Sequence, residues 1–448
     1  MASAAAELRP LVERLDARAP GGRAFGIRFW DGSELPPSPA RQGDAPALVL
    51  RDPDALVRIV RAPGELGLAR AWVSGELDVD GDLERAMALT EDWRHAPLRT
   101  ADALVALRAI RRLGVLRRPE PEPPASEARL TGRRHSSARD AEAISHHYDV
   151  SNAFYRRMLG PTMVYSCAYF ASPDDTLEEA QTRKLDLVCR KLELQPGERL
   201  LDIGCGWGSL LIHAGSEYGV RGVGVTVSAE QAALARERIA QAGLTGRVEI
   251  RLQDYRDVGE GPYDKISSIG MFEHVGRANL PVYFSGARQL LRPGGLFLNH
   301  GIVRTAPVST GLGSFSERYV FPDGELHTQG IVLSALEDAR FEVLDDESLR
   351  PHYAETLRRW AANHDAHRDA AIAEIGAERE RVWRLHNVGA ALGFERGSIS
   401  VHQVLTMPLE VGARRPVRVR RYEPKSQRLS FAEPSRQGAV PSKPAAHR

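Results

Sequence analysis

The spacing of hydrophobic positions changes along the chain, and that change predicts its architecture. Between residues 199 and 303, five short apolar runs have the length of buried strands, and helical stretches lie between several of them. Strands that alternate with helices at this spacing predict a parallel sheet wound on both faces. Two later runs flank a helical region over residues 354–390 and are expected to complete the sheet. In chain order, the runs are RLLDIG, RGVGVTV, RVEIRLQD, YDKISSIGM, GLFLNHGIV, RFEVLDDESL and SISVHQVLTMPL.

The part of the chain before this pattern is organised differently. A strand-like run, PALVLRD, is mixed with helical patterns such as PDALVRIVRAP and DLERAMALT, which predicts a smaller α+β domain over residues 1–113. Residues 114–140 are rich in Pro, Ser and Arg without apolar periodicity, as in a linker. The larger α/β domain is expected over 141–412, followed by a basic, disordered tail over 413–448.

Composition narrows the class of protein. Of 448 residues, 42% are hydrophobic and 27% charged, as in an ordinary soluble protein. The three cysteines, Cys167, Cys189 and Cys205, form no C-x-x-C pair, which argues against a disulfide framework and a structural zinc site, and no metal is expected. Neither a signal peptide nor an apolar run of about 18 residues is visible, so a cytoplasmic protein is predicted.

A net charge of +1 conceals an asymmetry, because the segment from Val411 onward carries +8 and the remainder −7. Basic tails contact nucleic acid or anionic membrane surfaces, although the charge alone is better explained by a solvated, disordered end. Few aromatic side chains stand in the tail, which disfavours nucleic acid. Transient contact with the inner membrane surface is therefore expected. Two further arginine pairs could attract anionic headgroups, Arg111 with Arg112 and Arg133 with Arg134.

The stretch DIGCGWG places Gly204, Gly206 and Gly208 between a predicted strand and a predicted helix. Such glycines permit a tight turn and close approach of the backbone to a ligand. A plain βα turn and a dinucleotide site both remain open from this loop alone. However, the spacing is not G-x-G-x-x-G, and the next strand ends near Thr226 rather than in an acid.

Several motifs together resemble one family. LDIGCGWG, GVTVSAEQ, LQDYRD and MFEHVG, in this order, are similar to the cyclopropane-fatty-acyl-phospholipid synthases, which are S-adenosylmethionine-dependent methyltransferases related to the mycolic-acid cyclopropane synthases. The resemblance covers residues 141–410, and the N-terminal part resembles the lipid-binding domain of longer bacterial members. It implies a class I methyltransferase (Rossmann-like) fold. The implied activity is transfer of a methylene group from S-adenosylmethionine to a double bond of an unsaturated phospholipid acyl chain, which forms a cyclopropane.

The resemblance also implies where the cofactor binds. A cationic sulfonium is better placed against carboxylates and neutral acceptors than against a phosphate-binding helix start. The implied cofactor residues are Tyr165, Ser166, Asp202, Gly204, Gly206, Gly208, Thr226, Gln231, Asp254 and Tyr255.

Methylation of an alkene leaves a carbocation, which must be kept from water and must lose a proton to a base. The family uses a bound bicarbonate for this step. Taken singly, the cysteine, histidine and tyrosine of the implied set could each be core residues, whereas a glutamate ending an apolar strand has little structural explanation. His274 stays ambiguous, and Ala390 stands where some members carry a cysteine, which excludes a thiol nucleophile there. The implied bicarbonate ligands are Cys167, Glu273, His300, Tyr353 and the backbone of Ile302.

Further functions remain open from the sequence. The same site could give a methylene- or methyl-branched chain, because the cation then loses a different proton. Two more hypotheses are a small-molecule methyltransferase and a nucleic-acid-binding protein with a decayed cofactor fold. The sequence does not reveal the double-bond position, the headgroup or the oligomeric state, and a homodimer is compatible with it.

Overall fold

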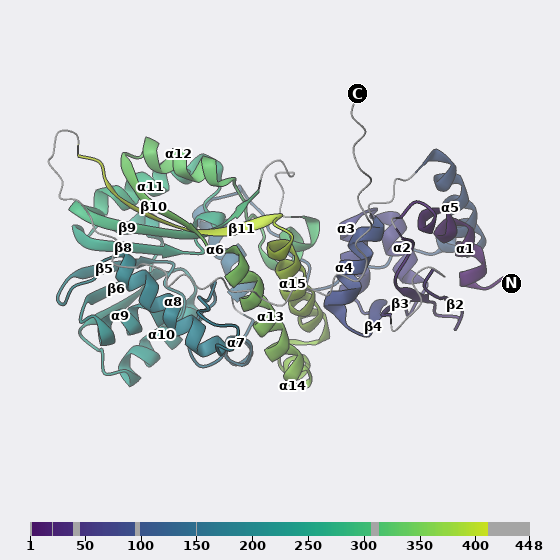
Figure 1. Cartoon of the computed structure of the whole chain (residues 1–448), viewed down its shortest axis with the longest axis horizontal. Coiled ribbons are helices and arrows are strands. Elements are labelled where there is room, and N and C mark those ends of the chain that lie inside the picture. The colour runs from purple at the N-terminus through teal and green to yellow at the C-terminus, as the bar shows by residue number, and fades with distance from the viewer. Residues whose placement is uncertain are drawn as a thin grey trace, which may run out of the picture.

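A computed structural model describes residues 2–19, 21–38, 45–94, 99–148, 150–305 and 313–410. A four-stranded sheet with its helices lies at one end of the long axis, and a seven-stranded sheet lies at the other (Figure 1). Three helices stand between them: α13 (Arg350–Ala366), α14 (Arg368–Ile375) and α15 (Ala377–Glu395). The basic tail predicted over 413–448 lies outside the described residues.

The N-terminal part combines a small sheet with five helices. Its strand order is β2-β1-β3-β4, with β1 parallel to β3 and the other neighbours antiparallel. The strands are β1 (Gly26–Arg28), β2 (Glu34–Leu35), β3 (Ala47–Leu50) and β4 (Leu77–Asp80). The helices are α1 (Ala4–Asp16), α2 (Asp54–Arg61), α3 (Glu65–Val73), α4 (Leu83–Arg94) and α5 (Thr100–Arg112).

The larger sheet has the order β10-β11-β9-β8-β5-β6-β7. β5 to β9 are parallel to one another, whereas β11 runs antiparallel to both of its neighbours, β9 and β10. The predicted, mostly parallel sheet is therefore confirmed, and every predicted run forms a strand. The strands are β5 (Arg199–Ile203), β6 (Arg221–Thr226), β7 (Val248–Leu252), β8 (Tyr263–Ile269), β9 (Leu291–Arg304), β10 (Phe341–Ser348) and β11 (Ile399–Pro408).

Helices cover both faces of this sheet because successive strand residues point to opposite sides. On one face, Leu298 and Leu405 join an apolar core with three helices. On the other face, Phe297 and Val404 join a second core with two helices. The first set is α8 (Leu177–Lys191), α9 (Ser209–Glu217) and α10 (Ala229–Gln241); the second is α11 (Leu280–Leu290) and α12 (Gln329–Asp338).

Buried contacts join the two ends of the molecule. The indole nitrogen of Trp72, on α3, donates to the carbonyl oxygen of Arg381, on α15, at 2.9 Å. The Arg381 guanidinium lies 4.3 Å from the centroid of the Trp72 ring and donates to the Leu77 carbonyl oxygen at 2.6 Å. Val388 and Tyr319 pack in the same apolar cluster. The N-terminal part is thus docked on α15 by an apolar and hydrogen-bonded interface.

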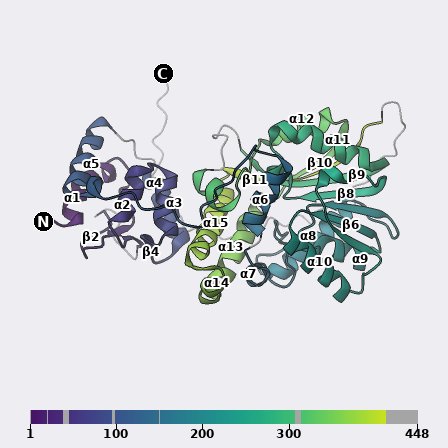
Figure 2. The ribbon, with the colours of Figure 1, turned by 180° about the vertical axis from the view of Figure 1, so that it is seen from behind.

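The predicted linker also carries structure that its composition does not indicate. It contains a 3-10 turn, Val115–Arg117, and the first residues of α6 (Ser137–Tyr148), and it crosses from the N-terminal end toward the larger sheet (Figure 2). Within it, the buried carboxylate of Glu127 accepts hydrogen bonds from Arg70 at 2.8 and 2.9 Å and from the Tyr319 hydroxyl at 3.0 Å. The middle of the segment is therefore attached to Arg70 of α3 and to Tyr319.

Glu127→Gln is expected to loosen this attachment. The amide removes the charge that two Arg70 donors share, and a hydrogen bond to a charged group typically contributes about 2 kcal/mol. Chemical denaturation should show a free energy of unfolding lower by about that amount, and proteolysis within residues 117–136 should accelerate. Glu122→Gln, at an exposed position of the same segment, is the matched control and should change neither. Equal behaviour of the two variants would contradict this role of Glu127.

Candidate active site

The glycine loop after β5 turns over the end of β6. The backbone nitrogen of Gly204 donates to the carbonyl oxygen of Val225 at 3.0 Å. Gly206 and Gly208 have φ of 53° and 77°, a region that other residues rarely adopt. A Cβ added to Gly206 would meet no atom within 4 Å, whereas one added to Gly208 would lie 3.4 Å from the Cβ of Ala235. Gly206 therefore borders open space, whereas Gly208 lies against Ala235 of α10.

That open space is a cavity at the carboxyl ends of β5 and β6, where open α/β sheets bind their ligands. Gly208 is the one predicted cofactor residue that does not line it; it precedes α9 as its N-cap. The predicted residues that do line the cavity are Tyr165, Ser166, Asp202, Gly204, Gly206, Thr226, Gln231, Asp254 and Tyr255.

A carboxyl group and an amine are buried at the cavity wall. Asp202, 3% exposed, accepts a hydrogen bond from the Ser267 hydroxyl at 2.7 Å, and burial raises its pKa to about 6. Lys184, 2% exposed, donates from Nζ to the Ser166 hydroxyl at 2.8 Å, and burial lowers its pKa to about 8. Each group is shifted toward its neutral form because a low dielectric penalises charge. Lys184 thereby positions Ser166.

Two further sets of polar contacts at the cavity hold the loops after β6 and β7. The Thr226 hydroxyl donates to the side-chain oxygen of Gln231 at 2.8 Å. Asp254 accepts hydrogen bonds from Arg256 at 2.6 and 2.8 Å, and Arg256 reaches Asp140 at 3.0 Å. Burial would raise the pKa of Asp254, but the hydrogen bonds from Arg256 hold it below its usual value.

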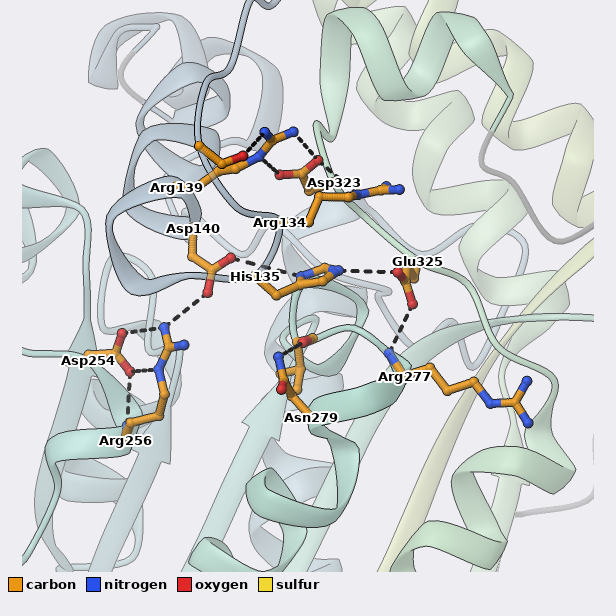
Figure 3. Close-up of polar contacts among 12 residues, drawn as sticks. Arg134, His135, Arg139, Asp140, Asp254, Arg256, Arg277, Asn279, Asp323 and Glu325 are labelled. Atoms are coloured by element: carbon orange, nitrogen blue, oxygen red, sulfur yellow. Dashed lines mark hydrogen bonds and ion pairs between the residues drawn. The ribbon is translucent and has the colours of Figure 1, made fainter.

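Residues 134–140, which the sequence assigned to a linker, reach the cavity at Asp140, and Figure 3 shows the polar contacts that hold this segment. The ring of His135 lies between Glu325, at 3.2 Å, and Asp140, at 3.9 Å. It also lies against Gly276, where an added Cβ would come within 2.5 Å of the ring. Asp323 holds the same segment by accepting from Arg134 and Arg139.

Glu273 lies beyond the end of β8, in the 3-10 turn Phe272–His274, and not at the end of the strand as predicted. The turn closes on β9 at Gly301, where an added Cβ would collide with the Phe272 ring. This approach lets Oε1 of Glu273 accept a hydrogen bond from the backbone nitrogen of Ile302 at 2.7 Å. Its other oxygen, Oε2, is buried without a partner in the described chain, and burial raises the Glu273 pKa to about 7.

His300 shares a face of β9 with Ile302, two residues further along. Its side chain is buried, and its Nδ1 has no hydrogen-bond partner among the described residues. Burial, reinforced by the nearby charges of Lys184 and Lys191, keeps its pKa well below the usual value. The imidazole is therefore neutral at ordinary pH, with one nitrogen as a donor and the other as an acceptor.

Cys167 and Tyr353 complete the predicted set from other segments. The Cys167 thiol donates to the Leu349 carbonyl oxygen at 3.7 Å, and the Leu349 nitrogen donates to Val401 of β11 at 2.9 Å. Val401 pairs with Ile302 across the sheet. Tyr353, on α13, packs in the same apolar cluster as Cys167 and Ile302. The five implied residues are thus brought to one region by four separate segments, and burial raises the pKa of the thiol well above its usual range.

Some residues at the cavity were not predicted from the sequence. Lys184 had a detectable signal, since it stands on the apolar stripe of α8 between the buried residues Ala180 and Val188. Asp140 and Arg256 had none, because their ion pair joins positions far apart in the chain. His274, whose role the sequence left open, lines the cavity, and burial lowers its pKa to about 4.

Comparisons with known proteins agree with this geometry. The family model described as mycolic acid cyclopropane synthetase matches residues 135–404. A probable fatty acid methyltransferase of Mycobacterium tuberculosis is 44% identical over 405 residues, which cover 88% of this chain and 93% of that protein. The cyclopropane-fatty-acyl-phospholipid synthase of Escherichia coli is 42% identical over 214 residues, or 48% of this chain and 54% of that protein.

Among solved structures, the mycolic acid cyclopropane synthase CmaA1 complexed with SAH and CTAB is similar, with a TM-score of 0.57 and 36% identity. The likeness covers 59% of this chain and 97% of that one. The family match extends over more than half of the chain and contains the cavity, the glycine loop and the turn that carries Glu273. The chain therefore belongs to the mycolic acid cyclopropane synthetase family of S-adenosylmethionine-dependent methyltransferases.

Proposed function

We propose that the protein transfers a methylene group from S-adenosylmethionine to a double bond of an unsaturated phospholipid acyl chain and closes a cyclopropane ring, with bicarbonate as the base. The observation that supports this most directly is the pair of buried, unpartnered atoms Glu273 Oε2 and His300 Nδ1. Buried polar atoms without a partner destabilise a fold, so such a pair favours a site that serves a ligand.

The residues fit a small protonated anion. Glu273 offers an acceptor to a hydroxyl group, and the neutral His300 ring can donate without competing for the proton that the reaction releases. Bicarbonate would supply the base that removes this proton. Cys167 stays a thiol because its pKa is raised, so it is not a competing nucleophile for the methyl group.

An apolar wall suits the rest of the chemistry. The ring centroids of Tyr165 and Trp360 lie 5.1 Å apart, those of Tyr155 and Tyr165 5.6 Å, and Tyr165 also lines the cavity. Aromatic faces stabilise a cation and exclude water, which would otherwise capture the carbocation as an alcohol. These side chains therefore support an alkene as the methyl acceptor.

A second candidate is methylation of an acyl chain to a methylene- or methyl-branched product. The relative named a probable fatty acid methyltransferase supports it, since the likeness extends over nearly the whole of both chains. The same cation is formed, and the product depends on which proton is lost. A small-molecule methyltransferase is a third candidate, but the shared N-terminal part favours a lipid substrate.

A lipid substrate requires contact with a membrane surface, for which we propose one face of α5. Leu104 and Leu107 are 56% and 51% exposed there, and Arg108 and Arg111, which follow them along the helix, are exposed as well. The spacing places all four on one side of the helix. Such a face inserts apolar side chains among lipids while its arginines attract anionic headgroups. Within the described chain, no helix combines the length and hydrophobicity needed to cross a bilayer.

Other arginines named from the sequence have partners in the protein. Arg112 lies 3.3 Å from Glu7, and Arg134 lies 3.1 Å from Asp323. Their contribution to membrane contact is therefore expected to be smaller than that of Arg108 and Arg111.

Expression in a host that makes unsaturated phospholipids tests the activity. Mass spectrometry should show acyl chains heavier by about 14 mass units, the gain of one methylene group. Cyclopropyl proton signals in NMR spectra would support ring closure, and a branched pattern would support the second candidate. Unsaturated lipids of unchanged mass would contradict both.

Glu273→Gln tests the base. The amide lacks the negative charge with which Glu273 would hold the hydroxyl group of bicarbonate. Turnover should therefore fall by about 10²–10⁴-fold, the usual effect of losing a positioned base. Calorimetry should show S-adenosylmethionine affinity nearly unchanged. Adding bicarbonate to depleted buffer should accelerate the wild type far more than the variant. Glu337→Gln, on the exposed side of α12, is the control and should behave as wild type. If wild-type turnover is indifferent to bicarbonate, a protein side chain must take the proton.

Replacing Leu104 and Leu107 together by serine tests the membrane face. Sedimentation with anionic phospholipid vesicles should show binding weakened by about tenfold, because two half-exposed leucines no longer enter the lipid. The matched control replaces two comparably exposed apolar residues of the larger sheet and its helices, Leu252 and Val282, by serine. If the two double variants bind vesicles equally, α5 is not the contact.

A further inference from the structure

Gln403 lies in the middle of the larger sheet, beside the proposed bicarbonate site. It pairs with His300 of β9 on one side and with Glu347 of β10 on the other. Residues that are paired across neighbouring strands project from the same face. Glu347, Gln403 and His300 therefore form a lateral row, on the face that also carries Ile302.

The Gln403 side chain is completely buried, and neither its oxygen nor its nitrogen has a hydrogen-bond partner in the described chain. A primary amide is a costly residue to bury unpaired, and an apolar side chain of similar size would fill the same place. Two further unpartnered atoms accompany it, Nδ1 of His300 in the same row and Oε2 of Glu273. The Gln403 amide and the two proposed bicarbonate ligands thus all have buried polar atoms without hydrogen-bond partners in the described chain.

Two donors of the implied set are already engaged within the protein. The backbone nitrogen of Ile302 already donates to Glu273 at 2.7 Å. The Cys167 thiol is directed at two carbonyl oxygens, those of Ala168 at 3.2 Å and Leu349 at 3.7 Å. A bicarbonate ion needs one acceptor for its hydroxyl group and several donors for its other oxygens. The amide of Gln403 carries two N–H donors, which no other residue of the implied set matches.

The charges around the row also favour an anion. Glu347, the neighbour of Gln403 on β10, accepts a hydrogen bond from the fully buried Lys191. Its negative charge is thereby balanced and does not repel an anion at Gln403. Lys184 and Lys191 both act on His300 from α8, which shows that their positive potential reaches this row.

We propose that Gln403 is a further anion-binding residue of this site, whose side-chain amide donates to the bicarbonate that His300 and Glu273 hold. The inference rests on the proposed function, because it assigns Gln403 to the same anion. It also distinguishes Gln403 from a purely structural residue. The amide would increase the affinity for bicarbonate without stabilising the free protein.

The test compares Gln403→Leu with the wild type in two ways. Calorimetric titration with sodium bicarbonate, in the presence of S-adenosylhomocysteine, should show affinity lowered at least tenfold, and the bicarbonate concentration for half-maximal turnover should rise in parallel. S-adenosylhomocysteine affinity should be unchanged. The melting temperature should be equal or higher, because the variant removes an unpaired buried amide. Gln403→Met, which keeps the chain unbranched, provides a second variant if leucine does not fit.

Asn299→Leu is the matched control. Asn299 directly precedes His300 on β9. Like Gln403 it is buried and has an unpartnered side-chain oxygen, but it projects from the sheet face opposite to that of His300 and Gln403. The bicarbonate affinity of the Asn299→Leu variant should equal that of the wild type. Unchanged affinity in Gln403→Leu, or a fall in melting temperature without a change in affinity, would overturn the inference while leaving the proposed function intact. A wild type that neither binds bicarbonate nor responds to it would instead overturn the proposed base, and the inference with it.

Discussion

β9 runs past the end of β8, so the backbone amide of Ile302 has no partner on β8 and donates to Glu273 instead. The bond is made because Phe272 packs directly on Gly301, where any side chain would collide with the ring. One oxygen of the carboxylate is thereby fixed, and the other is buried without a protein partner among the described residues. The geometry of the candidate site depends on this contact between a short turn and a strand.

Burial sets the protonation states around that contact. The pKa values of Asp202 and Glu273 are raised, and those of Lys184 and His300 are lowered, each because water is excluded. A site of neutral or balanced groups suits a cationic cofactor that reacts with an uncharged alkene. Strong unpaired charges there would bind the cofactor in its ground state without assisting the transition state.

The positions of many elements followed from local pattern. Strand-length apolar runs and helical stretches predicted the sheet because their periodicities differ and each reflects one-sided or complete burial. The glycine loop and Thr226 converged at the cavity for a simple reason: the carboxyl ends of neighbouring parallel strands meet at one edge of the sheet. The resemblance added the residues that periodicity cannot identify, such as Tyr165 and His300.

What the sequence by itself determined is therefore the order of strands and helices and the loops at their ends, because neighbouring residues specify these through burial period and backbone conformation. Only the tertiary structure decided that Asp140 lines the cavity, that Gly208 does not, and that Glu273 lies beyond its strand. It also placed Gln403 beside His300, across more than one hundred intervening residues. Such contacts depend on strand register and on packing between distant segments, and no local pattern of hydrophobic and polar positions encodes either.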